Sequence, residues 1–205
     1  MKHLITLAVA LICFSTLNAQ NSNIKLQTKY GSDNKELQDL LRFQEVETIK
    51  LSFTGDDLKG KDYRLMVKEY TNGSLAKTDT IMDSSKFNYI PAITDSVFEF
   101  KYYVKTQLDN TIKMNFMFDR FSTPRLYDIK VSKDKYALHD FLKTSDPMSV
   151  AVNTNTLIMG YFLPYIDKTT GWKKYCDVAG SEHKPEEWGR VFNIPNYYLV
   201  EIIFE

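Results

Sequence analysis

The stretch YRLMVKEYTNGSLAKTDTIM, residues 63–82, contains the strongest structural signal of the chain. Residues 63–70 alternate apolar and polar side chains, which is typical of a β-strand with one buried face. Asn72-Gly73 follows at once, and both central positions of a type I′ turn need a positive φ, which Asn and Gly tolerate best. The sequence therefore predicts a β-hairpin whose second strand covers residues 75–82.

The same alternation continues on both sides of this hairpin. Within residues 46–53, the apolar residues Ile49, Leu51 and Phe53 share one side of a predicted strand. Further strand-like runs cover residues 97–104, 111–118, 127–131, 149–152, 156–165 and 197–204. The last of these, YYLVEIIF, is apolar on nearly both sides, as expected of a central strand.

Helix signals are sparse. Residues 36–43 place Leu37, Leu40 and Leu41 at helical spacing, and residues 136–142 show a similar pattern. Each predicted helix has at most about two turns and needs tertiary packing to form. Many short strands with two small helices predict an all-β fold, namely a β-sandwich of mainly antiparallel strands with one or two short helices.

We expect residues 21–205 to form a single β-sandwich domain. The alternative is a pair of small sandwiches joined at residues 119–125 (DRFSTPR). Domain linkers are usually richer in Gly, Ser and Pro than this segment, which favours the single domain.

The first twenty residues have the three parts of a secretory signal peptide. Lys2 supplies a positive charge, and residues 4–14 (LITLAVALICF) form an apolar core that is too short to span a bilayer comfortably. Residues 15–20 (STLNAQ) are polar, with Ala19 suited to a cleavage site. We therefore expect an exported protein in the periplasm, at the cell surface or outside the cell, with no membrane span after cleavage.

Charge and cysteine content exclude several classes of function. The chain has 26 basic and 26 acidic residues and no block of Lys or Arg, so the sequence predicts no nucleic-acid partner. Signal cleavage removes Cys13 and leaves Cys176, which cannot form an internal disulfide alone and is expected to be packed and unreactive. No metal site and no cofactor are predicted.

The sequence nominates no catalytic residue, because it contains neither Gly-x-Ser-x-Gly nor a glycine-rich phosphate loop. The adjacent acidic pairs Asp56-Asp57 and Glu186-Glu187 lie in polar, turn-rich segments. Neighbours in sequence rarely face each other across a substrate, so we interpret both pairs as solvated charges. His139 is expected to be a surface or boundary histidine.

Residues 169–190 (TTGWKKYCDVAGSEHKPEEWGR) have an unusual composition and resemble a long irregular loop. Long loops in compact domains are often functional, and aromatic rings beside charged groups suit a sugar ligand. The competing interpretation is that the two tryptophans plug one end of the sandwich. The candidate ligand-binding residues are Trp172, Tyr175, His183 and Trp188.

The chain resembles the small exported proteins of unknown function that are common in Bacteroidetes. The resemblance rests on the STLNAQ ending, on the length, and on the segments YRLMVKEYTNGSLAKTDTI and GWKKYCDVAGSEHKPEEWGR. It implies an envelope or extracellular location and a place in glycan handling. It implies no activity, and no functional residue is carried over from it.

These observations favour a non-catalytic exported binding or interaction module of the cell envelope, with a glycan or an envelope protein as its partner. A glycoside hydrolase with a dispersed acidic pair is one alternative. A structural envelope subunit that adds a strand to a neighbour through an open sheet edge is the other.

Overall fold

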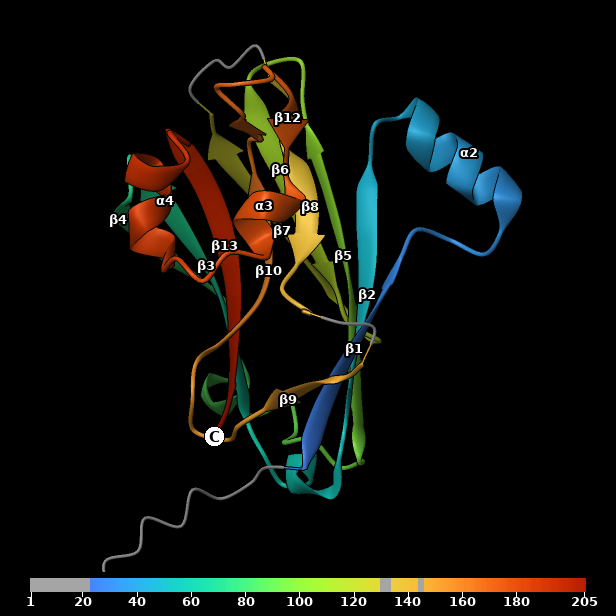
Figure 1. The fold of residues 1–205 in the computed structure, drawn as a ribbon. Coiled ribbons are helices and arrows are strands. Elements are labelled where there is room, and N and C mark those ends of the chain that lie inside the picture. The colour runs from blue at the N-terminus through green and yellow to red at the C-terminus, as the bar shows by residue number, and fades with distance from the viewer. Residues whose placement is uncertain (1–22, 130–133, 144–145) are drawn as a thin grey trace, which may run out of the picture.

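The computed structural model describes residues 23–129, 134–143 and 146–205 of the chain, and the signal-like residues 1–20 lie outside this part. Two antiparallel sheets pack face to face (Figure 1), which confirms the predicted β-sandwich. The first sheet has six strands in the order β7-β6-β5-β2-β1-β9. These strands are β1 (Ile24–Tyr30), β2 (Glu47–Thr54), β5 (Val97–Thr106), β6 (Thr111–Met117), β7 (Ser122–Asp128) and β9 (Met148–Val150).

The second sheet has five strands in the order β4-β3-β13-β10-β8. These strands are β3 (Tyr63–Thr71), β4 (Ser74–Asp83), β8 (Ala137–Asp140), β10 (Thr156–Phe162) and β13 (Asn196–Phe204). A separate small hairpin pairs β11 (Tyr165–Ile166) with β12 (Lys173–Lys174). The helices are α2 (Lys35–Phe43), α3 (Cys176–Ala179) and α4 (Pro185–Val191), with 3-10 turns η1 (Asp56–Leu58) and η2 (Ser84–Lys86).

The predicted hairpin is present as β3 and β4. Its two central turn residues, Asn72 and Gly73, have φ of 51° and 84°, as the type I′ prediction requires. The prediction for the last strand is also confirmed, since β13 lies in the middle of its sheet between β3 and β10.

Three local predictions were wrong or incomplete. Residues 136–142 form no helix, because 137–140 pair with β10 as strand β8, and short apolar runs fit either period. The strand β1, whose apolar residues Ile24 and Leu26 are fully buried, was not predicted. The strand expected at 127–131 begins earlier, at Ser122, and ends at Asp128.

Strands from both sides of residues 119–125 contribute to each sheet. In the six-stranded sheet β9 pairs with β1, and in the five-stranded sheet β13 pairs with β3 over nine residue pairs from Asn196–Thr71 to Phe204–Tyr63. A division of the chain at Pro124 would therefore assign strands that pair with each other to different halves.

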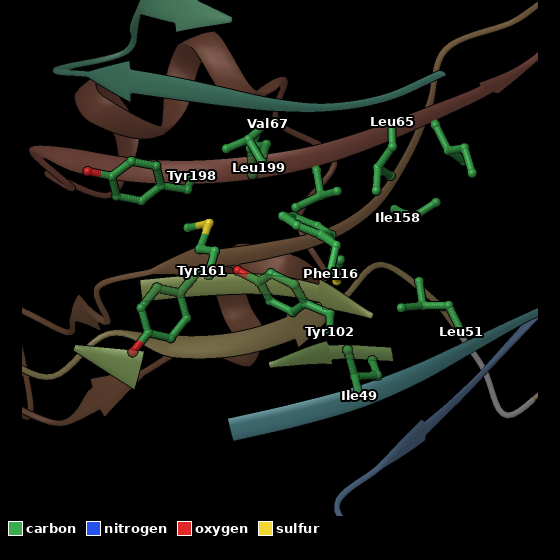
Figure 2. Close-up of a cluster of buried hydrophobic side chains, with 14 of the residues drawn as sticks. Ile49, Leu51, Leu65, Val67, Tyr102, Phe116, Ile158, Tyr161, Tyr198 and Leu199 are labelled. Carbon is green, nitrogen blue, oxygen red and sulfur yellow. The ribbon is translucent and has the colours of Figure 1, made fainter. Parts of the chain in front are cut away.

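The core forms between the inner faces of the two sheets. Figure 2 shows Ile49 and Leu51 of β2 facing Leu65 and Val67 of β3 across this interior. Aromatic rings connect the layers at several points, for example where Phe53 of β2 meets Phe204 of β13 edge-on, with ring centroids 5.2 Å apart.

The strand β13 is buried on both faces, so a third layer covers its outer side. The ring of Tyr197 points outward and packs between two other rings. Its centroid lies 5.3 Å from that of Trp188 of α4 and 5.1 Å from that of Tyr70 of β3. Helix α4 is seated directly on the β3–β4 turn, since a Cβ at Gly189 would overlap the backbone of Asn72 and Gly73. The hairpin turn thus positions α4, the helix that covers the outer face of β13.

The edge strands β7 and β4 belong to different sheets and are joined by side chains. The Asp79 carboxylate of β4 accepts hydrogen bonds from the Tyr127 hydroxyl, at 2.9 Å, and from the Arg125 guanidinium, at 3.2 Å. The register of β7 on β6 turns the backbone nitrogen of Pro124 toward the open side of β7. A proline there offers no N–H to a further strand, which protects this edge.

Two buried tyrosines differ in hydrogen bonding and give a matched test of the core. The Tyr136 hydroxyl donates to Asn196 Oδ1 at 2.9 Å, whereas the fully buried Tyr102 hydroxyl has no partner among the described residues. We expect Tyr136→Phe to lower the free energy of unfolding by about 1 kcal/mol and Tyr102→Phe to leave it unchanged or raise it. Urea unfolding of both variants measures this, and equal losses would contradict the assigned partners.

The close approach of α4 to the hairpin turn gives a second prediction. Gly→Ala in an exposed helix normally stabilises by up to ~1 kcal/mol. Gly189→Ala should instead destabilise by about 1–3 kcal/mol, because its methyl group has no space. Arg190→Ala on the same helix is the control and should change stability by less than about 0.5 kcal/mol. A Gly189→Ala protein as stable as the wild type in thermal unfolding would disprove the contact.

Candidate functional site

Helix α2 stands away from the end of the sandwich (Figure 1). Its residues help to line a groove of about 890 Å³. One wall is the segment from the end of β1 through α2 to the start of β2. The turn between β5 and β6 and the residues just before β8 contribute the rest, together with Tyr161 of β10. Its volume lies in the range of small-molecule sites, which makes it the leading candidate for ligand binding.

Local hydrogen bonds hold α2 in place. Asn34 caps its first turn by accepting from the Leu37 N–H at 3.0 Å, and the Ser32 N–H donates to Gln38 Oε1 at 2.8 Å. At the other end, the Val46 N–H donates to the Leu41 carbonyl at 2.9 Å. Leu41 is the buried residue of the helix, so the groove wall is anchored at both ends and in its middle.

The groove is lined by hydroxyl, amide and charged groups together with apolar side chains such as Leu41 and Leu108. The Tyr161 and Thr106 hydroxyls lie 3.2 Å apart, and Tyr30 presents a half-exposed ring. Glu45 and Lys135 form an ion pair at 2.6 Å, and the hydrogen bond from Lys135, together with its charge, lowers the pKa of the Glu45 carboxyl. Such a lining offers hydrogen bonds beside an apolar surface of at least equal extent.

Glu47 points into this end of the sandwich and has a structural role. It lies in the same inward register as Ile49 and Leu51, and its carboxylate accepts from the Leu138 N–H of β8 at 3.0 Å. Burial raises the pKa of this carboxyl above its ordinary value of 4.5, and the bond from Leu138 opposes that rise only in part.

The next N–H on the unpaired edge of β8, that of Asp140, also has a side-chain hydrogen-bond partner. The Asp140 N–H donates to the Tyr30 hydroxyl at 2.6 Å, and Thr28 donates to the Asp140 carboxylate at 2.5 Å. Side chains of β1 and β2 thus occupy the edge of β8, which protects it against strand addition.

The predicted ligand-binding residues differ in their exposure to solvent. Trp172 is 72% exposed, next to the small β11–β12 hairpin, whereas Trp188 is 2% exposed and packs on Phe162 and Tyr197. The ring of Trp188 is therefore not available to stack on a ligand, and its Nε1–H donates to the His183 carbonyl at 3.2 Å.

Tyr175 connects the predicted aromatic segment to the groove. Its hydroxyl donates to the Lys135 carbonyl at 2.7 Å, and its ring stacks on His139. The His139 ring stacks in turn on Phe162, and burial lowers the pKa of this histidine. His183 is half-exposed and lies 3.5 Å from Glu187.

Residues 169–190 do not form the irregular loop that we expected. They contain β12, α3 and α4, and Val178 and Trp188 anchor the two helices by burial. Two short helices separated by a polar turn lack a long periodic pattern, which explains why the sequence concealed them. Cys176 is exposed at the start of α3, so its predicted packing was wrong.

The adjacent acidic pairs have local partners. Asp56 pairs with Lys59 at 2.8 Å, and Glu187 accepts from the Lys184 N–H at the start of α4 at 3.1 Å. Glu186 accepts from the Tyr70 hydroxyl at 3.2 Å. Asp56 and Glu187 thus stabilise a turn and the start of a helix, and Glu186 connects that helix to Tyr70 of β3.

Among the described residues, no group of three or more His, Cys, Asp or Glu side chains is placed to hold a metal ion. In residues 23–129, 134–143 and 146–205, every helix is too short or too polar to cross a bilayer.

Neither protein-family models, nor curated proteins, nor solved structures show a match to this chain.

Sequence reasoning did not find the groove, although one signal was present. Glu47 stands in the inward register of a strand whose other inward residues are apolar. A carboxylate in such a position needs a buried hydrogen-bond partner, and so marks an unusual place in the core.

The raised pKa of Glu47 predicts a pH-dependent contribution to stability. The folded state retains this proton to higher pH than the unfolded state, so the stabilisation is complete below pH 4.5 and is lost as pH rises through the folded-state pKa. Glu47→Gln keeps the acceptor for Leu138 without the buried charge. We expect it to gain stability relative to the wild type between about pH 4 and pH 7.

Urea unfolding at a series of pH values measures this difference. Glu47→Leu is the control, because it removes the acceptor and should destabilise at every pH by about 1–3 kcal/mol. A Gln variant whose stability tracks the wild type across the whole pH series would contradict the buried position of the charge.

Proposed function

We propose that this protein is a non-catalytic carbohydrate-binding module whose ligand lies in the groove between α2 and the sandwich. The observation that carries the proposal is the lining of that groove. A volume of about 890 Å³ is lined by Tyr30, Tyr161, Gln38, Gln107 and Asn110 together with charged and apolar residues. Amides and hydroxyls satisfy sugar hydroxyls, and a half-exposed tyrosine ring suits the apolar face of a pyranose.

The proposed setting is the cell envelope or the extracellular space. Support comes from the signal-like residues 1–20 and from the resemblance to exported Bacteroidetes proteins. An exported module that binds glycan would act where polysaccharides are encountered or held.

A second candidate function is docking to an envelope protein. The specific observation in its favour is the apolar side of α2, where Leu40 is 55% and Phe43 is 81% exposed. Exposed apolar residues at helical spacing are typical of protein interaction surfaces.

Glycan-array screening followed by calorimetry tests the proposed function. We expect the double variant Tyr30→Ala/Arg42→Ala, which alters the groove wall, to lose binding by at least about tenfold. Trp172→Ala serves as the matched control, because this exposed ring lies next to the β11–β12 hairpin and does not line the groove. It should bind as the wild type does.

Three results would contradict the proposal. No glycan bound by the wild-type protein would reject carbohydrate binding. Loss of binding in Trp172→Ala with retention in the groove variant would move the site to the exposed tryptophan. Release of reducing ends from a bound glycan would favour the hydrolase alternative over a non-catalytic module.

A further inference from the structure

The outer face of the six-stranded sheet carries lysines that are direct neighbours across strands. The register places Lys29 of β1 opposite Lys50 of β2, and Lys50 opposite Lys101 of β5. A second pair, Lys105 and Lys113, lies opposite each other on β5 and β6. We call Lys29, Lys50 and Lys101 the lysine row.

All three side chains of the lysine row point away from the core, because they alternate with buried residues such as Ile49 and Phe100. Two carboxylates lie close to the row: Glu99 pairs with Lys50 at 2.7 Å, and Asp33 pairs with Lys29. Within the described residues, Lys101 forms no ion pair. The face is therefore positive, although basic and acidic residues balance over the whole chain.

The row is unfavourable for the fold itself. Like charges directly opposite each other on neighbouring strands destabilise a sheet, and strands lie only ~4.8 Å apart. Glu99 offsets this repulsion at Lys50 and Asp33 offsets it at Lys29, which leaves Lys101 as the lysine of the row without an ion pair among the described residues. Charge left unbalanced on an exposed face is available to an anionic ligand.

Two hollows border the lysine row. One, of about 290 Å³, lies between α2 and the sheet and is lined by all three lysines together with Tyr103, Ser32 and Thr48. The other, of about 610 Å³, lies on the opposite side and includes Gln27, Ser52, Lys29 and Lys50. The smaller hollow adjoins the groove at the end of the sandwich, because both are lined by Gly31, Ser32, Leu41 and Thr48.

We propose that the lysine row binds the negative groups of an acidic polysaccharide that continues into the groove. This inference rests on the proposed function and names its ligand class, a glycan with a carboxylate on successive sugars. One strand spacing, ~4.8 Å, separates successive lysines, so a single sugar chain laid across the strands passes more than one ammonium group. The ammonium group of Lys101, which forms no ion pair among the described residues, can then bind a carboxylate of the chain, with Lys29 and Lys50 adding positive charge beside it. Thr48, Ser52 and Gln27 supply hydrogen bonds to hydroxyls.

The same surface suits single-stranded nucleic acid less well. Proteins that bind it stack successive bases on several aromatic rings along the charged path. Among the described outward-facing residues of β1, β2, β5 and β6, Tyr103 is the one aromatic residue. The other outward-facing positions of these strands carry hydroxyl and amide groups together with Val97, Glu99 and Met117. The scarcity of aromatic rings and the presence of hydroxyl and amide groups favour a hydroxyl-rich ligand.

The test compares a polygalacturonate hexamer with its fully methyl-esterified form by calorimetry at low salt. The two probes share a backbone and differ in charge. We expect the acid to bind at least about tenfold more tightly, with an affinity that falls as salt rises. Lys29→Gln/Lys101→Gln should remove this preference. Lys143→Gln/Lys168→Gln, which changes the net charge equally at exposed positions outside the row, should retain it.

A melting curve separates lost binding from lost folding. Because Lys29→Gln/Lys101→Gln relieves the repulsion with Lys50, its melting temperature at low salt should equal or exceed that of the wild type. A folded variant that has lost the preference for acid supports the proposal.

The remaining outcomes overturn it in distinguishable ways. Equal binding of acid and ester would reject the role of the lysine row and leave the proposed glycan binding intact. If the protein binds neither polymer and no other glycan, both proposals are rejected. Acid binding that survives in Lys29→Gln/Lys101→Gln would place the anion elsewhere. A single-stranded DNA oligomer of equal charge bound as tightly as the hexamer would reject the glycan class.

Discussion

Burial of the last strand, β13, on both of its faces is the constraint on which the rest of the structure depends. Its inner side contributes Phe204 and Tyr198 to the core between the sheets. Its outer side needs a cover, which α4 supplies through Trp188. That cover can approach only because Gly189 lets the helix rest directly on the β3–β4 turn. Packing of this kind holds together a chain whose described part has one free cysteine.

Side-chain contacts close two sides of the sandwich, so the candidate binding surfaces lie elsewhere on the molecule. Asp79 joins β4 to β7 on one side, while Glu47 and Tyr30 cover the open edge of β8 on the other. The end of the sandwich beside α2 stays open as a groove. Because α3 and α4 lie on the five-stranded sheet and α2 borders only one end of the six-stranded sheet, most of the outer face of the latter is left to polar side chains and the lysine row.

Local patterns predicted the architecture better than the site. Period-two runs located most strands, and Asn72-Gly73 fixed the hairpin, because these signals depend on a few neighbouring residues. The short segments 136–142 and 169–190 were misinterpreted, since partners far away in sequence decide whether such segments form strand, helix or loop. Trp188 and Tyr175 belong to one aromatic layer, but composition alone could not tell the buried ring from a ligand-binding one.

The sequence by itself determined that the chain forms layered antiparallel sheets and which side chains share one face of each strand, because alternation is a property of a single strand. The same alternation placed Lys50 and Lys101 on polar faces, whereas Lys29 lies in β1, which was not predicted. Only the tertiary structure decided that Lys29, Lys50 and Lys101 are neighbours, since this follows from strand order and register. The physical reason is that register is set by burying the apolar faces of all strands together, which no single run encodes.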